Sequence, residues 1–480
     1  MRRTALDSEL AESGRVREAA ASLSRVERLI VVLLCMVVLV AIVPYGATGN
    51  IAMPLALLAA SIWCFAATLA AGRGWPAISL MSVAIAVLLG GYMLLQASSD
   101  LHLLPPSQSF VRASALLGNT LSASASIAPG RTMDALAPIL VPLVLFAAAC
   151  RFLRTDLSAI SVLRFLSWFG GAVALFGILQ HLLAPDIVLL SPKTSYLGDL
   201  TAVFVNRNTA ATFLGGSALV SVAVVAYDIG RRPTWNALLA LAASARLTRR
   251  DWSMALHASM AVAALAALLL TSSRAGTAAS LVAVTLLISI LFRSAEPGRR
   301  APSRSPWPFM RRWALVLLAG SSIAVLLGTR TLDRALTQGA EDARFCVFPD
   351  IWRLAGQTWP WGSGAGTFEL AFRPLRDPTC GIHGVWDRAH SFFLEGLVVL
   401  GAPFLAAAAL GLGVLAVTLR RGWRQRQQFR AGPALGCAFL ALVILHDLVD
   451  FSIQIPGISL WAATVLAACC ALCERKQTAA

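Results

Sequence analysis

Charged side chains are scarce in this sequence. Asp, Glu, Lys and Arg make up 13% of its 480 residues, whereas a soluble globular domain carries about 25%. Hydrophobic residues make up 58%, and the mean hydropathy is +0.72. This shortage of charge excludes an ordinary soluble protein and predicts a chain that lies largely within a membrane.

Acidic residues are the scarcer charged type, with 24 Asp and Glu against 40 Lys and Arg. In a soluble protein the net charge of +16 would suggest a nucleic-acid partner, but no basic domain interleaved with aromatic residues is present, and we expect no nucleic acid. Lys and Arg instead gather in alternate polar gaps between apolar runs, at 1–28, 230–252, 293–312 and 419–431. Because cytoplasmic loops retain positive charge, these segments are predicted to face the cytoplasm.

Metal-binding patterns are also missing. The nine cysteines lack the spacing of a metal site, and the segments expected outside contain no Asp-x-Asp or Asp-x-Glu run that would hold Mg²⁺. We therefore predict neither a bound metal nor another cofactor. Cys346 and Cys380 differ from the other seven because both lie in one long outer segment. An outer compartment permits disulfides, so these two are the predicted pair.

Long apolar runs are abundant. A membrane helix needs about 20 apolar residues, and the candidate runs are 29–46, 50–71, 76–97, 134–152, 159–183, 208–228, 253–272, 276–293, 313–330, 391–418, 432–450 and 457–473. We predict an all-α polytopic membrane protein with about twelve transmembrane helices. Its membrane domain spans 29–473, between cytoplasmic tails at 1–28 and 474–480. The N-terminal tail mixes both signs of charge and shows no cleavage site, unlike a signal peptide.

Segment 331–390 is the longest polar stretch and is predicted to be a periplasmic loop. A structureless loop of this length is uncommon. After Asp350, apolar residues recur at the spacing of one helix face, and Trp352, Trp359 and Trp361 suit a membrane–water interface. We predict a short amphipathic helix on the outer surface of the bilayer. A loop helix whose apolar face is buried in the protein is the alternative.

The arginines of interest all fall at the predicted outer ends of the helices. Arg207 precedes the sixth run, Arg274 lies in the short turn between the seventh and eighth, and Arg344 begins the amphipathic segment. Arg274 has no acidic residue close to it in sequence, and an unpaired arginine near a membrane is costly. A bound anion would explain it. For Arg207 and Asn208, the alternative is that they only cap a helix.

Histidines lie at the same predicted ends. His390 begins the tenth run, and His446 lies with Asp450 at the end of the eleventh. Histidine can accept a proton from a hydroxyl, whereas the planar fork of arginine matches phosphate oxygens. Together they predict transfer from a lipid-linked phosphate or diphosphate to a hydroxyl. The alternatives are an interfacial role for His390 and a structural i,i+4 pair for His446 and Asp450.

Several stretches resemble the bacterial O-antigen ligase and polysaccharide polymerase superfamily. They are 204–211, 273–276, Arg344 with 359–368, and 389–395 followed by Gly401; 446–451 also fits. The similarity covers about 200–455, with the long outer loop before the histidine. The asparagine that usually follows the histidine in this family is replaced by Ser391, which can also cap a helix.

The resemblance implies a GT-C-like glycosyltransferase of the bacterial inner membrane. Such enzymes move a glycan from undecaprenyl diphosphate to an acceptor hydroxyl on the periplasmic side, and we expect a metal-independent, inverting reaction. The acceptor is lipid A–core in a ligase, a lipid-linked glycan in a polymerase and a protein hydroxyl in an O-oligosaccharyltransferase. Of these, we favour the ligase type. Membrane lipid is the other expected partner.

The resemblance also assigns roles to individual residues. His390 is implied to activate or orient the acceptor hydroxyl, with His446 and then His383 as the next candidates. The residues implied to hold the diphosphate are Arg207, Arg274 and Arg344. The residues implied to support the site are Asn208, Glu395, His446 and Asp450.

A transporter or lipid-linked sugar flippase is the main rival from another class. Carriers place polar residues at mid-membrane and often show internal repeats, but 1–240 and 241–480 share no motif, and the polar residues of interest are predicted to cluster outside. A scaffolding membrane protein is a further alternative. Gly362, Gly364 and Gly366 do not follow a strand as nucleotide-binding glycines would, so we predict that they allow tight turns against the bundle.

Overall fold

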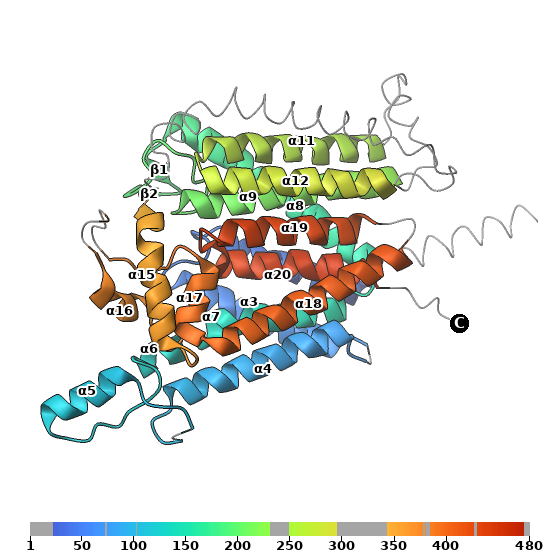
Figure 1. The fold of residues 1–480 in the computed structure, drawn as a ribbon. Helices are drawn as coiled ribbons and strands as arrows, with labels where there is room; N and C mark the ends of the chain where they lie inside the picture. Colours follow the sequence, from blue (N-terminus) through green and yellow to red (C-terminus); the bar gives the residue numbers. More distant parts are fainter. Residues whose placement is uncertain are drawn as a thin grey trace, which may run out of the picture.

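The computed structural model describes residues 23–72, 74–101, 103–230, 249–294, 343–377, 380, 385–426 and 430–474. This part of the chain forms a bundle of helices (Figure 1). Its strands are β1 (Ile187–Val188) and β2 (Ser191–Pro192), an antiparallel pair in the segment between two long helices. The predicted all-α class is confirmed.

Eight helical segments here are long and apolar enough to cross a membrane, so the chain is a multi-pass membrane protein. They are α3 (Ala52–Ala70), α4 (Ala77–Ala97), α6 (Pro129–Asp134) with α7 (Leu136–Phe152), α8 (Asp156–Leu183), α9 (Arg207–Gly230), α11 (Arg249–Leu270), α12 (Arg274–Ser294) and α18 (Ala402–Gln425). Further apolar helices are α2 (Arg25–Ile42), α19 (Ala431–Asp447) and α20 (Pro456–Ala471). The count of twelve stays a prediction because the run at 313–330 lies outside the described residues.

Helix α9 forms the centre of the bundle and packs against α8, α11, α12 and α19. Its glycines make this close packing possible. A Cβ at Gly215 would lie 2.0 Å from Oγ of Ser280 on α12, and a Cβ at Gly216 would lie 2.4 Å from the ring of Trp461 on α20. At these two positions α9 is therefore in close contact with α12 and α20.

The predicted single span at 391–418 is wrong, because the structure divides it into α17 (Phe392–Leu400) and α18. Gly401 separates the two helices with φ 63° and ψ −137°. A Cβ at this position would lie 2.1 Å from the backbone oxygen of Pro360, so the outer loop approaches too closely for any other residue.

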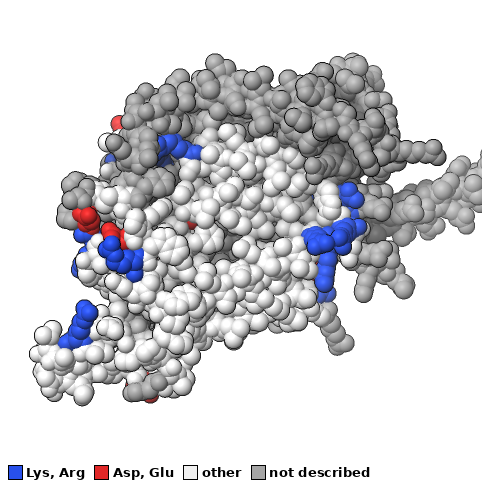
Figure 2. All heavy atoms as spheres, in the orientation of Figure 1, with Lys and Arg blue, Asp and Glu red and all other residues white. Residues whose placement is uncertain are grey.

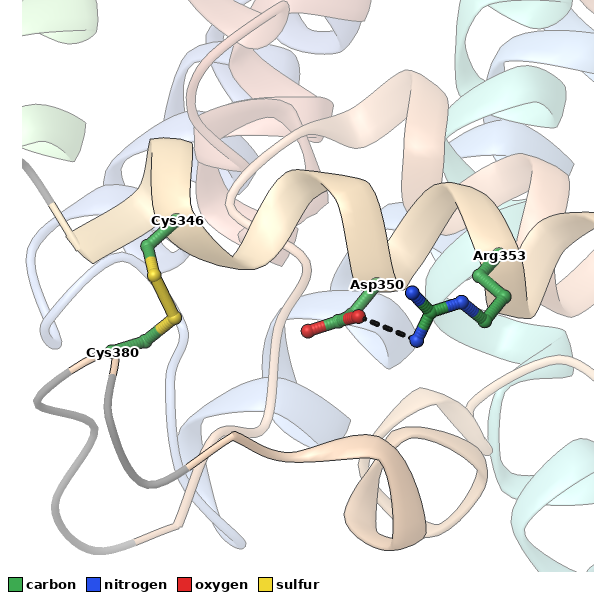
Figure 3. The surroundings of a disulfide bond; sticks show 4 residues. All are labelled: Cys346, Asp350, Arg353 and Cys380. Carbon is green, nitrogen blue, oxygen red and sulfur yellow. Dashed lines mark hydrogen bonds and ion pairs between the residues drawn. A yellow bond between two sulfur atoms is a disulfide. The ribbon is translucent and has the colours of Figure 1, made fainter.

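The outer segment contains α15 (Ala343–Thr358), α16 (Phe368–Phe372) and the 3₁₀ helix η1 (Arg373–Leu375). A disulfide joins Cys346 to Cys380, with 5.7 Å between their Cα atoms (Figure 3). The predicted amphipathic helix is present as α15. Ile351 and Leu354 are buried in a cluster with residues of α17, as the buried alternative expects, whereas Trp352 on the same helix is 59% exposed; the placement of α15 on the bilayer surface stays a prediction.

The glycines of the outer loop have the role predicted for them. Gly362, Gly364 and Gly366 have positive φ angles of 73°, 106° and 71°. Added Cβ atoms would lie 2.4 Å from the backbone of Val399, 2.2 Å from Oγ of Ser126 and 2.9 Å from the backbone of Arg131. The loop therefore turns tightly against the bundle at these points.

Charge separates the two ends of the bundle. Figure 2 shows a nearly uncharged middle with charged side chains toward both ends. We call the end where α18 finishes the arginine end; its described basic residues include Arg420, Arg421 and Arg424. We call the opposite end, which carries α15, α16 and α17, the loop end (Figure 1).

Candidate functional site

Two helices begin with an arginine at the loop end. Arg207 is the first residue of α9, and Arg274 is the first residue of α12. The first N–H groups of a helix have no intrahelical partner and give its N-terminus a partial positive charge. Each start therefore combines a guanidinium with the positive end of a helix, an arrangement that favours an anion.

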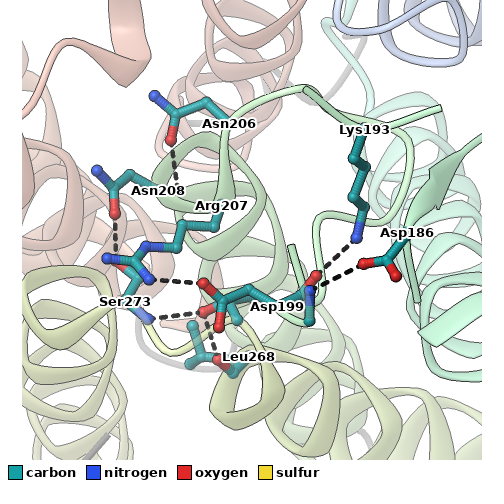
Figure 4. Close-up of polar contacts among 10 residues, drawn as sticks. Asp186, Lys193, Asp199, Asn206, Arg207, Asn208, Leu268 and Ser273 are labelled. Carbon is teal, nitrogen blue, oxygen red and sulfur yellow. Dashed lines mark hydrogen bonds and ion pairs between the residues drawn. The ribbon is translucent and has the colours of Figure 1, made fainter. Parts of the chain in front are cut away.

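A hydrogen bond joins these two helix starts. The Ser273 hydroxyl donates to Oδ1 of Asn208 over 2.9 Å (Figure 4), and both side chains are buried. Gly276 lets the helices approach closely, because a Cβ there would lie 2.5 Å from Cβ of Ala211. The α9 and α12 N-termini are therefore neighbours, although the two arginines are far apart in sequence.

Arg207 has an acidic partner that was not predicted. Its Nη1 lies 2.6 Å from Oδ2 of Asp199 (Figure 4). Its guanidinium lies 5.2 Å from the ring centre of Tyr196. The Asp199 side chain is only 2% exposed and that of Arg207 is 24% exposed. The signal in the sequence was weak, since Asp199 is simply one acid in the short segment before the Arg207 motif.

Lys193 adds a second cation beside the Arg207–Asp199 pair. Its Nζ donates to the backbone oxygens of Asp199 at 2.7 Å and Pro185 at 2.6 Å. Burial lowers the pKa of Lys193, although Asp186 and Asp199 act in the opposite direction. The cation restrains the turn that carries Asp199, and it was not among the predicted site residues.

The segment after α19 joins the same network. Nδ2 of Asn208 donates to Oδ1 of Asp450 over 3.0 Å, and the hydroxyl of Ser452, in the 3₁₀ helix η3 (Ser452–Gln454), donates to Oδ2. Nδ1 of His446 lies 2.6 Å from Oγ1 of Thr212, one turn further along α9. The predicted i,i+4 pair on one helix face is wrong, because α19 ends at Asp447 and Asp450 lies beyond it.

His390 lies where the outer segment enters α17. Its ring lies between Trp386 and Phe451, with centroid distances of 4.7 and 5.1 Å. Its φ of 51° falls in the left-handed region that few non-glycine residues occupy. The backbone N–H of Phe392 donates to the Asp450 backbone oxygen over 3.0 Å, so the histidine segment is tied to the network that includes Asn208.

Glu395 fixes the backbone just before His390. Its carboxylate accepts from the Ala389 backbone N–H at 2.9 Å and from Nη1 of Arg388 at 3.1 Å. Ser391 caps α17 by accepting from the Leu394 N–H at 3.4 Å, so the serine that replaces asparagine acts as predicted. Two other predicted candidates cannot be placed: the side chain of Arg344 and all of His383 lie outside the described part.

A second buried polar cluster lies inside the bundle and was missed. Oγ of Ser167 on α8 lies 2.8 Å from both Oγ of Ser221 on α9 and Nδ1 of His257 on α11. Nη2 of Arg164 on α8 also lies 2.6 Å from Oδ1 of Asp228 on α9. The expectation that the polar residues of interest gather only at one end is therefore wrong. These side chains bond mainly to one another, as expected for residues that hold three helices together.

A family model described as O-Antigen ligase matches residues 259–409, from α11 into α18. This confirms the resemblance to the O-antigen ligase superfamily over that part of the chain. Arg274, His390 and Glu395 lie within the match, whereas Arg207 and Asp450 lie outside it. A comparison with curated proteins finds no match.

Proposed function

We propose that this protein is an inner-membrane glycosyltransferase of the O-antigen ligase type. It would transfer a glycan from undecaprenyl diphosphate to an acceptor hydroxyl on the periplasmic side. The observation that carries the proposal is the pair of arginine-bearing helix starts joined by the Ser273–Asn208 hydrogen bond of 2.9 Å. Two guanidinium groups and two helix N-termini supply N–H donors and positive potential of the kind that binds phosphate oxygens.

The loop end is proposed to face the periplasm. The Cys346–Cys380 disulfide lies at this end, and disulfides persist in oxidising compartments such as the periplasm. The basic residues of α18 lie at the opposite end, as the preference of positive charge for the cytoplasm requires. Both observations support the same orientation.

The proposed reaction is a single displacement at the anomeric carbon. The acceptor oxygen forms a new bond to this carbon from one side while the bond to the diphosphate oxygen breaks on the other, so the anomeric centre inverts. His390 accepts the proton of the acceptor hydroxyl. Arg207 and Arg274 stabilise the charge that develops on the leaving diphosphate, and no metal ion is required.

Asp199 is proposed to position Arg207 rather than to contact the substrate. It binds one terminal nitrogen of the guanidinium, and the ring of Tyr196 lies near the guanidinium. These contacts fix the orientation of the fork before a donor arrives. A pre-oriented fork loses less conformational entropy when it binds phosphate oxygens.

A strain that lacks this protein would distinguish the possible acceptors. The ligase proposal predicts that the O-antigen ladder disappears from lipopolysaccharide on surface-glycan gels. Collapse of the ladder to single repeats would indicate a polymerase instead. Unchanged lipopolysaccharide with loss of protein glycosylation would indicate an O-oligosaccharyltransferase.

A further inference from the structure

Arg388 is a cation of the outer segment to which the proposed mechanism gives no role. It lies two residues before His390, and the chain bends at both positions. The rings of Trp386 and His390 are in contact, with 4.7 Å between their centroids, although four positions separate them. Arg388 therefore lies in the middle of a folded segment that ends at the histidine proposed to act on the acceptor.

Glu395 holds the guanidinium of Arg388 in place. Its Oε1 accepts from Nη1 of Arg388 at 3.1 Å, and its Oε2 accepts from the backbone N–H of Ala389 at 2.9 Å. The Glu395 side chain is only 6% exposed, and a buried carboxylate requires such donors. Because one carboxylate binds both the guanidinium and the backbone adjoining His390, the guanidinium lies close to the histidine.

This contact leaves much of the Arg388 fork accessible. The side chain is 37% exposed, and the bond to Glu395 engages Nη1. A guanidinium carries five N–H donors in one plane, so other donors can meet a ligand from the solvent side. The pair of Arg207 and Asp199 has the same form, with a buried acid on Nη1 of a partly exposed arginine. In both pairs the acid orients the guanidinium without covering it.

Other ion pairs of the outer segment lack this form. Arg353 pairs with Asp350, and Arg373 pairs with Glu369, within single turns of chain. Both arginines are well exposed, and their acids are less buried than Glu395. Exposed pairs of this kind contribute little, so these arginines provide controls of the same charge at the same end of the protein.

We propose that Arg388 binds an anionic group of the acceptor, a phosphate or a carboxylate, beside the hydroxyl that reacts. This inference rests on the proposed function. The planar fork of arginine matches the oxygens of either group, and an anion held next to His390 would bring the neighbouring hydroxyl to the imidazole. Arg207 and Arg274 would then hold the donor and Arg388 the acceptor, which is thus an acidic glycan.

Kinetics of the full-length protein in proteoliposomes test the proposal, with the undecaprenyl-diphosphate donor and with lipid A–core isolated from a strain that lacks the protein. Arg388→Gln should raise the KM for this acceptor about tenfold, as expected when a hydrogen bond to a charged group is lost, and leave the KM for the donor unchanged. Arg388→Lys should give a smaller rise, because it preserves the charge but not the fork. Arg373→Gln is the matched control and should preserve both constants.

Removal of the anion from the acceptor completes the comparison. Hydrofluoric acid removes the phosphates from one sample, and carbodiimide-mediated amidation neutralises the carboxylates of another. One treatment should raise the wild-type KM for the acceptor about tenfold and so identify the group. That treated acceptor should then give the same KM with the wild type and with Arg388→Gln, because two changes that break one contact are not additive.

Independent effects, with a combined rise of about 100-fold, would overturn the proposal. A rise in the KM for the donor alone would also overturn it, and so would treated acceptors that both bind as well as the untreated one. Arg388→Lys can still pair with Glu395 and serves for the same comparison if Arg388→Gln does not fold. Absence of transfer to lipid A–core by the wild type would contradict the ligase function itself, whereas transfer that is insensitive to Arg388 would contradict this inference alone.

Discussion

The hydroxyl of Ser273 donates a hydrogen bond of 2.9 Å to the side chain of Asn208, and each of these residues adjoins an arginine at a helix start. The bond lies in the buried contact between α9 and α12. Asn208 also donates to Asp450, which ties the helix starts to the segment that contacts His390. One small network of hydrogen bonds thus connects the residues proposed to bind the donor with the residue proposed to act on the acceptor.

Arg274→Lys should severely impair transfer, although it preserves the charge. The ammonium of lysine cannot match the paired hydrogen bonds that a guanidinium makes to phosphate oxygens, and the loss should be about 10- to 100-fold in activity. Activity is measured in membranes that contain equal amounts of each protein. Arg420→Lys, at the exposed arginine end of α18, is the matched control; equal activity of the two variants would contradict the role of Arg274.

Asp199→Asn should raise the KM for the lipid-linked donor about tenfold, with a smaller effect on kcat. The substitution removes the buried carboxylate that orients Arg207 without altering a residue that contacts the acceptor. Asp199→Glu should recover part of the affinity. Asp350→Asn breaks the exposed Asp350–Arg353 pair (Figure 3), and such surface pairs contribute little, so it should behave like the wild type. A fall confined to kcat would rule out the positioning role.

Replacing both Cys346 and Cys380 by serine should destabilise the outer segment. For a sequence separation of 34 residues, loss of the disulfide should cost about 3–4 kcal/mol through the entropy of the unfolded chain. Thermal unfolding and protease resistance of 343–380 provide the measurement, and dithiothreitol should reproduce the effect in the wild type. Cys437→Ser, which alters a free cysteine, is the control. Insensitivity to the reductant would show that the bridge does not stabilise this segment.

Transfer in purified membranes should survive excess EDTA. The proposed site neutralises the diphosphate with Arg207 and Arg274, so chelation of divalent cations should leave the rate unchanged. Complete loss on chelation, with recovery on adding Mg²⁺ or Mn²⁺, would refute this part of the mechanism.

Helix positions could be predicted from the sequence, but contacts between distant segments could not. Apolar run length located the membrane helices because it reflects the thickness of the bilayer. The break at Gly401 depends on the approach of Pro360, and this contact leaves no local pattern. The apolar face of α15 is divided in a way that its spacing does not reveal: Ile351 is buried and Trp352 is exposed. Amphipathic spacing shows that a face is apolar but not whether lipid or protein covers it.

In the candidate site too, local motifs could be predicted from the sequence, but contacts between distant segments could not. Local motifs identified Arg207, Arg274 and His390, since unusual polar residues stand out between apolar runs. The Asp199 carboxylate that pairs with Arg207 and the Ser273 hydroxyl that bonds Asn208 were not recognised. Short acidic and hydroxyl side chains are common in loops, and only the fold determines which of them meets an arginine or an amide.

The most direct test of the proposed mechanism compares donor binding with transfer in the His390→Ala variant, purified and placed in proteoliposomes. If His390 acts on the acceptor, the variant should bind the undecaprenyl-diphosphate donor as the wild type does, while transfer falls by about 10²- to 10⁴-fold. Retention of more than about a tenth of the wild-type rate would contradict the role of His390 as the general base. Loss of a general base should lower the rate by far more than about tenfold.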